Sequence, residues 1–312
     1  MEVSVTSIAE IAADICEIEL KSTKGDQLPS FAAGSHVDIQ LPDGVVRQYS
    51  LCNAPHDTTR YLLAVLLDPK TRGGSKAMHS LKQGDVLQIS EPKNNFALHP
   101  EATHSILLAG GIGITPILSM AHYLSTTDAS YEMHYSARNA QRMAYHDAIR
   151  NGDLGPHAEI YFDDGRQIDL STIVKNPQPN HHVYVCGPAG FIEAVEKACE
   201  TAGWDRSNVH RELFGNANAH KGTTGAFTVS IASTGVSVEV APTESVIEAL
   251  AKVGVDIPVS CQQGVCGTCL TRVLEGTPDH RDMYLTEEEQ AANDQFLPCC
   301  SRSCSERLVL DL

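Results

Sequence analysis

The sequence predicts a multidomain protein with an antiparallel β-barrel, an α/β domain built on a parallel sheet, and a small cysteine-rich domain. Three observations lead to this prediction. Short runs of alternating apolar residues fill the first hundred residues, apolar strands alternate with helical stretches over the next hundred, and six of the ten cysteines lie in the last 52 residues. The length of 312 residues leaves room for two or three domains of ordinary size.

The first part of the chain, residues 1–100, has the pattern of an antiparallel barrel. Short apolar runs are separated by turn sequences such as Pro42-Asp43-Gly44. Many short strands at close spacing are typical of a barrel. The expected strands cover residues 17–20, 36–41, 46–51, 61–67 and 86–89.

The second part, residues 101–215, has a different pattern. Apolar strands alternate with helical stretches, and this alternation is typical of a parallel sheet with crossover helices. The expected strands are 105–109, 132–137, 158–162 and 182–186, and the expected helices are 114–126, 142–150 and 189–202.

The third part, residues 226–312, differs in composition from the rest. The formal charge of the whole chain is −16, and half of it falls on the last 90 residues, which also hold most of the cysteines. The stretch before it, 216–225, is small and polar without apolar periodicity, as expected of a linker. The sequence therefore predicts a separate acidic domain at the C-terminal end.

Charge and composition exclude several classes of protein. With 39 acidic and 23 basic residues, the chain has no basic stripe for nucleic-acid phosphates or an anionic membrane. The N-terminal residues do not form a signal peptide, and no apolar stretch is long enough to span a bilayer. We therefore expect a cytoplasmic monomer without nucleic-acid or membrane partners, whose cysteines are reduced thiols.

The strongest chemical signal is the run Cys261-x4-Cys266-x2-Cys269, followed some thirty residues later by further cysteines. This is the spacing of plant-type [2Fe–2S] sites. Gly264 and Gly267 allow the tight loop in which backbone N–H groups point at the negatively charged cluster. Zinc is the alternative, but zinc sites usually use paired C-x2-C units, and only one is present. The residues alone leave the fourth ligand open among the cysteines at 299, 300 and 304.

A second candidate site lies in the predicted barrel. Arg47-Gln48-Tyr49-Ser50 ends an expected strand, and these side chains can pair with a phosphate, stack on a flavin ring and hydrogen-bond near its N5 atom. The glycine-rich turn Gly73-Gly74-Ser75 leads into a short helical stretch, an arrangement suited to phosphate. Between them, Ala64-Val65 is expected along the ring edge. These residues predict a flavin, and they leave FMN and FAD open because phosphate-binding residues do not exclude an adenylate tail.

A third candidate site lies in the predicted parallel-sheet domain. The run Gly110-Gly111-Ile112-Gly113-Ile114-Thr115-Pro116 passes from strand into helix, so its backbone can approach a pyrophosphate at the helix N-terminus. Pro116 replaces the third glycine of the usual fingerprint and suits the first helical turn. The segment Cys186-Gly187-Pro188 ends another expected strand, although Cys186 read alone could be an ordinary buried thiol. Together these segments predict a nicotinamide dinucleotide.

With these motifs in the same order, the whole chain resembles the phthalate dioxygenase reductase and vanillate O-demethylase reductase family. The shared features include R-x-Y-S, G-G-S, G-G-I-G-I-T-P, C-G-P and the segment Cys299-Cys300-Ser301-Arg302. The resemblance implies an FMN-binding barrel (1–100), an NAD-binding domain (101–215), a linker (216–225) and an α+β ferredoxin domain of the β-grasp type with a [2Fe–2S] cluster (226–312). It makes Cys299 the fourth iron ligand, places Phe214 near the flavin or nicotinamide ring with Glu212 as a polar neighbour, and favours NADH over NADPH.

The resemblance also implies a function. The chain would be the reductase component of a Rieske-type non-haem iron oxygenase, passing electrons from NADH through FMN and the cluster to the oxygenase. Two alternatives stay open: a stand-alone NADH-dependent flavin diaphorase, and a zinc-bearing binding module without a redox role. In this reading Ser50 and Cys186 border the hydride path. The cofactor-binding residues are Arg47, Tyr49, Ser50, Ala64, Val65, Gly73, Gly74, Ser75, Gly111, Gly113, Thr115, Cys186, Gly187, Pro188 and Phe214, and the metal ligands are Cys261, Cys266, Cys269 and Cys299.

Overall fold

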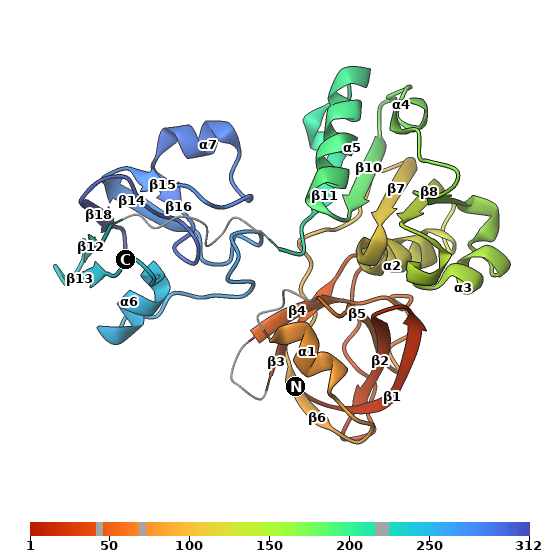
Figure 1. Cartoon of the computed structure of the whole chain (residues 1–312), viewed down its shortest axis with the longest axis horizontal. Coiled ribbons are helices and arrows are strands. Elements are labelled where there is room, and N and C mark those ends of the chain that lie inside the picture. The colour runs from red at the N-terminus through yellow and green to blue at the C-terminus, as the bar shows by residue number, and fades with distance from the viewer. Residues whose placement is uncertain (42–45, 69–72, 216–224) are drawn as a thin grey trace. The chain divides into compact units, whose positions relative to one another are not determined.

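The computed structural model of the chain describes residues 1–41, 46–68, 73–215 and 225–312 (Figure 1). The chain divides into two compact units, Met1–Leu213 and Phe214–Leu312. Most of the predicted linker, residues 216–224, lies outside the described residues. Within the described part, no helix combines the length and the apolar character that a membrane crossing requires.

The first half of the first unit is an antiparallel sheet of six strands. In chain order these are β1 (Glu2–Ala12), β2 (Ile15–Ser22), β3 (His36–Gln40), β4 (Val46–Ser50), β5 (Tyr61–Leu66) and β6 (Val86–Ile89), with the helix α1 (Gly74–His79) between the last two. The strand order is β4-β3-β6-β1-β2-β5, and the two end strands contact each other, so that the sheet curls into a barrel. Alternation along β2 buries Ile18 and Leu20 inside it.

The second half of the first unit is a five-stranded parallel sheet with the order β11-β10-β7-β8-β9. Its strands are β7 (His104–Gly110), β8 (Ser130–Ala137), β9 (Ala158–Phe162), β10 (His181–Cys186) and β11 (Val209–Glu212). The connecting helices are α2 (Ile114–Leu124), α3 (His146–Asn151), α4 (Leu170–Ile173) and α5 (Ala189–Ala202). The order reverses at β7, between β8 and β10, and ligands of such sheets bind at the carboxyl ends of the strands at this switch point.

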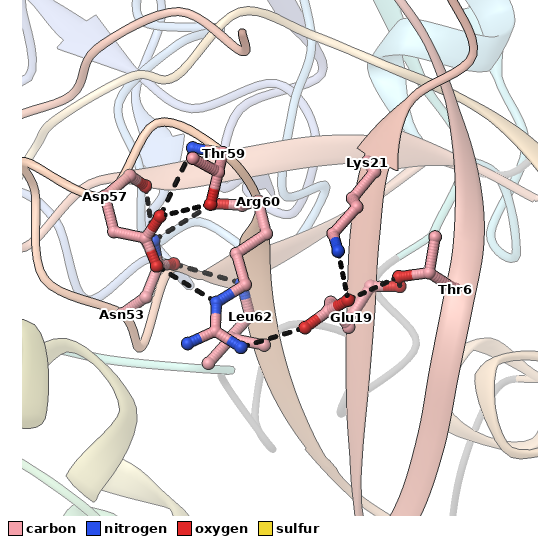
Figure 2. A network of polar contacts seen from close by, with 8 residues as sticks. All are labelled: Thr6, Glu19, Lys21, Asn53, Asp57, Thr59, Arg60 and Leu62. Carbon is pink, nitrogen blue, oxygen red and sulfur yellow. Dashed lines mark hydrogen bonds and ion pairs between the residues drawn. The ribbon is translucent and has the colours of Figure 1, made fainter. Parts of the chain in front are cut away.

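A polar network fixes the loop that follows β4 (Figure 2). The Asn53 side-chain amide donates to the carbonyls of Asp57 and Arg60 at 2.9 and 3.0 Å, and its Oδ1 accepts from the Leu62 amide at 3.0 Å. The Arg60 guanidinium in turn binds the carboxylates of Asp57 and Glu19 at 3.0 and 2.9 Å. This network holds the loop beyond Ser50 against the barrel wall.

The same loop is also tied to the parallel-sheet half of the first unit. The Ser119 hydroxyl, on α2, donates to the Asn53 carbonyl at 3.1 Å and is completely buried. The carboxyl end of β4 is therefore held against the helix that follows β7.

The second unit is a mixed sheet around one helix. The strands are β12 (Phe227–Ile231), β13 (Ser237–Val240), β14 (Thr271–Glu275), β16 (Gln295–Phe296) and β18 (Arg307–Leu310), in the order β13-β12-β18-β14-β16. β12 and β18 are parallel, and the other pairs are antiparallel. The helix α6 (Val246–Lys252) contributes Val246, Ala249 and Leu250 to the core. Outside the sheet lie the pair β15 (Pro278–Asp279) and β17 (Arg302–Ser303), and the helix α7 (Glu287–Ala292).

The predicted fold class is confirmed: an antiparallel barrel, a parallel α/β sheet and a β-grasp domain follow one another along the chain. Strands β1 and β11, the helix α4 and the strands of the second unit were not predicted, and α3 begins four residues later than the predicted helix 142–150. The predicted boundary at residue 100 falls inside the first compact unit, between β6 and β7.

Candidate functional site

The glycines at the carboxyl ends of β7 and β10 bring two predicted motifs into contact. A Cβ placed on Gly113 would lie 2.2 Å from the carbonyl oxygen of Cys186, far inside van der Waals contact. A Cβ on Gly110 would meet the Phe191 ring at 2.9 Å, and one on Gly187 would lie 3.0 Å from the Gly110 Cα atom. The close contact between the two strand ends therefore requires residues without a side chain in both segments.

The start of α2 is shaped for close approach by a ligand. Gly111 has a φ of +54°, and the chain passes through one short 3-10 turn, Gly111–Gly113, directly into the helix. The buried Thr115 hydroxyl donates to the Ile112 carbonyl at 3.1 Å and stabilises this turn. An α-helix N-terminus at a switch point fits a pyrophosphate.

Ser50, Cys186 and Glu212 meet beside this turn. Cys186 and Glu212 are paired in register across the parallel strands β10 and β11, and the Ser50 hydroxyl at the end of β4 hydrogen-bonds to the Glu212 carboxyl group. Burial raises the pKa of Glu212 to about 8, against the smaller opposing effect of Ser50. Burial, with the nearby Glu212 charge, also raises the pKa of the Cys186 thiol well above its usual value. At neutral pH this site therefore contains a neutral thiol and a largely protonated carboxyl group.

The resemblance made Glu212 only a polar neighbour of Phe214, not a cofactor-binding or catalytic residue. Its Oε2 atom is buried and has no hydrogen-bond partner among the described residues. A buried polar atom without a partner calls for an explanation, and a bound polar group is one. The sequence signal is modest: Glu212 ends a short strand two residues before Phe214.

The two predicted flavin segments of the barrel also come together. A Cβ on Gly74 would lie 3.0 Å from Cγ and 3.1 Å from Nε of Arg47, so the arginine side chain packs across the glycine-rich turn. Gly73 has a φ of +98° at the start of α1. The Asp68 amide donates to the Ser75 hydroxyl at 3.2 Å, and the His79 ring binds the Val65 carbonyl at 2.8 Å. A guanidinium group over a glycine turn is a donor set that fits a phosphate.

The strand segment beside this turn is apolar and tightly packed. Ala64 and Val65 on β5 are 6% and 3% exposed. Burial raises the pKa of Tyr49 to about 12, while Arg47 lowers it and Cys16 raises it. Tyr49 is thus close to Arg47 and to Cys16, the residue paired with Val65. The residues present therefore fit a flavin with a phosphate at its tail.

The four predicted iron ligands form two thiol pairs in the second unit. The thiols of Cys261 and Cys266 hydrogen-bond to each other, and those of Cys269 and Cys299 do the same. Among the described residues, no group of three or more His, Cys, Asp or Glu side chains surrounds a single metal ion. Two separate pairs suit a two-iron cluster, in which each iron takes two protein ligands.

Two glycines with positive φ shape the ligand loop. A Cβ on Gly264, at φ +70°, would overlap the Cys300 sulfur, and one on Gly267, at φ +71°, would overlap the Tyr284 ring. The Gln263 amide donates to the Cys261 sulfur at 3.3 Å, so the loop already directs one N–H group at a ligand. The loop therefore fits a negatively charged cluster.

Cys300 has a different environment from Cys299. Its sulfur lies 3.7 Å from both the Leu297 carbonyl and the Ser301 hydroxyl, hydrogen-bonds to the Cys299 thiol and lies against Gly264 of the ligand loop. The thiol that hydrogen-bonds to Cys269 is that of Cys299, and this pairing agrees with Cys299 as the predicted ligand. Cys304 is exposed.

Phe214 is not among the residues that the first unit brings together. It is the first residue of the second compact unit and is 42% exposed. Pro188 precedes α5, directly after Cys186 and Gly187.

Comparisons with known proteins cover the whole chain. The family model for the 2Fe-2S iron-sulfur cluster binding domain matches residues 229–304. The vanillate O-demethylase oxidoreductase of Pseudomonas putida is 46% identical, over 99% of this chain and 98% of that protein. The phthalate 4,5-dioxygenase oxygenase reductase subunit of the same species is 37% identical, over 99% and 95%.

A solved structure matches equally completely. It is that of phthalate dioxygenase reductase, described as a modular structure for electron transfer from pyridine nucleotides to [2Fe-2S]. The sequence identity is 36%, the match covers 100% of this chain and 98% of the other, and the TM-score is 0.82.

Proposed function

Because the chain belongs to the phthalate dioxygenase reductase and vanillate O-demethylase reductase family, we propose that it is the reductase component of a Rieske-type oxygenase. The chain is an oxidoreductase that transfers electrons from NADH through FMN and a [2Fe–2S] cluster to an oxygenase. The Rieske type of the partner, the monomeric state and a cytoplasmic location are parts of the proposal. So are the domain bounds 1–100, 101–215 and 226–312.

In the first unit, the proposed role of each residue follows from its contacts. FMN, when bound, supplies the conversion between two-electron transfer from NADH and one-electron transfer to the cluster. Arg47 would hold the phosphate over Gly73, Gly74 and Ser75, and Tyr49 would flank the ring beside the strand residues Ala64-Val65. Gly111, Gly113 and Thr115 would hold the dinucleotide at the start of α2.

Ser50, Cys186 and Glu212 define the place where the two rings must meet. The Cys186 thiol is protonated and completely buried, so it adds no charge beside the place where the nicotinamide would lie. The Ser50 hydroxyl, oriented by Glu212, is the polar group at the same place. The chemistry needs little acid–base assistance, so these residues act by orientation and by exclusion of water.

The observation that carries the proposal is the pairing of Cys261 with Cys266 and of Cys269 with Cys299 in one chain with a dinucleotide-type switch point. The test is the visible spectrum of the purified protein. We expect flavin and iron–sulfur absorption that bleaches on anaerobic addition of NADH. A colourless protein that binds zinc would refute the proposal.

The partner is tested separately with a purified Rieske-type oxygenase. We expect NADH-dependent turnover of the oxygenase that requires this chain. Rapid reduction of dyes without any reduction of the oxygenase would instead support the stand-alone diaphorase. Since half of the net charge lies on the last 90 residues, transfer should slow as salt increases.

A further inference from the structure

Asp282 lies against the loop that carries three of the proposed cluster ligands. Its side chain is completely buried. A Cβ on Gly264, in the middle of that loop, would lie 3.0 Å from both the Cα and the Cβ atom of Asp282. The next residue, Met283, donates its amide hydrogen to the Gly264 carbonyl at 2.9 Å. The backbone at residues 282–283 is therefore packed on the loop.

The carboxylate of Asp282 also reaches the segment that carries the fourth ligand. The Ser301 hydroxyl, two residues beyond Cys299, donates to Oδ1 of Asp282 at 3.3 Å and accepts from the Arg281 amide at 3.1 Å. The Ser301 amide donates to the Leu297 carbonyl at 2.9 Å, which closes the turn around Cys299. Asp282 thus connects the loop that carries three of the proposed ligands with the segment that carries the fourth.

The second carboxylate oxygen is held by the backbone. Oδ2 accepts from the amides of Tyr284 and Leu285 at 3.2 and 2.9 Å. Hydrogen bonds to a carboxylate are stronger than those between neutral groups, and burial strengthens them further. The Asp282 side chain is therefore fixed at both oxygens.

The charges around this carboxylate are limited. The Arg281 guanidinium binds Asp279 at 2.9 and 2.7 Å. The His280 ring lies 3.6 Å from Oδ1 and is 9% exposed, and both of its nitrogens lack hydrogen-bond partners among the described residues. The hydrogen bonds that hold the Asp282 carboxylate come from a hydroxyl and two backbone amides, which are all neutral groups.

We propose that Asp282 is a positioning residue for the [2Fe–2S] cluster: through Ser301 it fixes the two ligand-bearing segments relative to each other, and its buried charge lowers the reduction potential. A fixed negative charge at a poorly solvated site opposes the arrival of an electron nearby. Charge and hydrogen bonding around a cluster are established determinants of its potential. The inference rests on the proposed function, because it requires that the four thiols bind this cluster.

The test compares three variants of the full chain with the wild type, all loaded with cluster. Asp282→Asn removes the charge and keeps the shape, and Ser301→Ala keeps the charge but removes the hydroxyl that joins Asp282 and the Arg281 amide to the Cys299 segment. Asp294→Asn is the matched control, since it removes the same charge from an exposed side chain of the same unit, where the backbone carbonyl pairs with Val273. The midpoint potential is measured by a redox titration followed by EPR, and cluster loss by its rate in the presence of a chelator.

We expect Asp282→Asn to raise the midpoint potential and to change the EPR line shape, with Asp294→Asn like the wild type. Loss of a hydrogen bond to a charged group should make Ser301→Ala lose its cluster about tenfold faster. If Asp282→Asn does not fold, the EPR line shape and the rate of cluster loss of Ser301→Ala provide the test.

Faster cluster loss with an unchanged spectrum and potential would show a merely structural role and overturn the inference. Variants that match Asp294→Asn in every measurement would also overturn it. A wild-type protein that cannot bind the cluster would refute the proposed function itself.

Discussion

Replacing Glu212 by glutamine should stabilise the first compact unit, and by more at pH 8 than at pH 5. The carboxyl group of Glu212 is buried, and burial raises its pKa from 4.5 to about 8. The folded unit must therefore keep a proton that the unfolded chain releases. Glutamine has nearly the same shape, can accept the Ser50 hydrogen bond and carries no charge at any pH.

The size of the effect follows from the two pKa values. Below about pH 4.5 both states hold the proton and Glu212 costs nothing by this mechanism. Between pH 4.5 and 8 the folded state binds more protons than the unfolded state, so stability falls as the pH rises. At ~1.4 kcal/mol per pKa unit, the ionisation of Glu212 in the unfolded chain lowers the free energy of unfolding by about 3 kcal/mol at pH 7 and by about 5 kcal/mol above pH 8.

The single tryptophan provides an assay for this unit alone. Trp204 is buried at the end of α5, and its indole N–H donates to the Val174 carbonyl at 2.7 Å. Urea unfolding followed by its fluorescence, in excess FMN at pH 5, 6, 7 and 8, gives the free energy of unfolding. The control is Glu193→Gln, which removes an exposed charge from α5.

The result that would refute the reasoning is a constant difference between wild type and Glu212→Gln at all four pH values. Such parallel curves would mean that Glu212 is ionised in the folded protein. A variant that is less stable than the wild type at every pH would contradict the argument as well. If the prediction holds, the unit retains a costly carboxyl group beside Ser50 and Cys186, which indicates a role at the meeting place of the two rings.

Three further predictions concern other parts of the chain. Cys299→Ser should abolish the iron–sulfur absorption while Cys300→Ser keeps it, and the reverse would overturn the ligand assignment. Gly113→Ala should reduce the rate of flavin reduction by NADH in stopped-flow experiments, because its methyl group would overlap the Cys186 carbonyl; an unchanged rate would contradict this steric argument. His210→Phe should retain more stability on acidification, because burial lowers the pKa of His210 from 6.5 to about 4 and the wild type loses stability as the pH falls through this range. Identical acid unfolding of the two proteins would refute it.

The fold could be predicted where apolar residues repeat with a clear period. The alternation in β2 and the apolar runs of β7 and β10 identified their strands. β1 was missed because only Val3 and Val5 are buried in an eleven-residue strand, so most of its pattern is irregular. β11 was missed because its sequence, Val-His-Arg-Glu, is polar, as an edge strand of a sheet can be.

The candidate sites could be predicted only as far as local motifs allow. The cysteine spacing indicated a cluster because the loop is continuous in sequence. The packing of Arg47 on Gly74 and the meeting of Ser50 with Glu212 depend on strand order, which the local pattern does not contain. Glu212 becomes conspicuous only when its burial is known, since a glutamate in a polar tetrapeptide is otherwise unremarkable.

The position of β18 in its sheet determines when the cluster site can form during synthesis. β18 is the third of five strands and pairs with both β12 and β14, yet it is made after all four proposed ligands. The two halves of the sheet therefore stay unjoined until after the last ligand, Cys299, has been made. A finished site for the iron requires Arg307–Leu310 to be paired, and a chain without that pairing leaves its thiols open to oxidants and to competing metals.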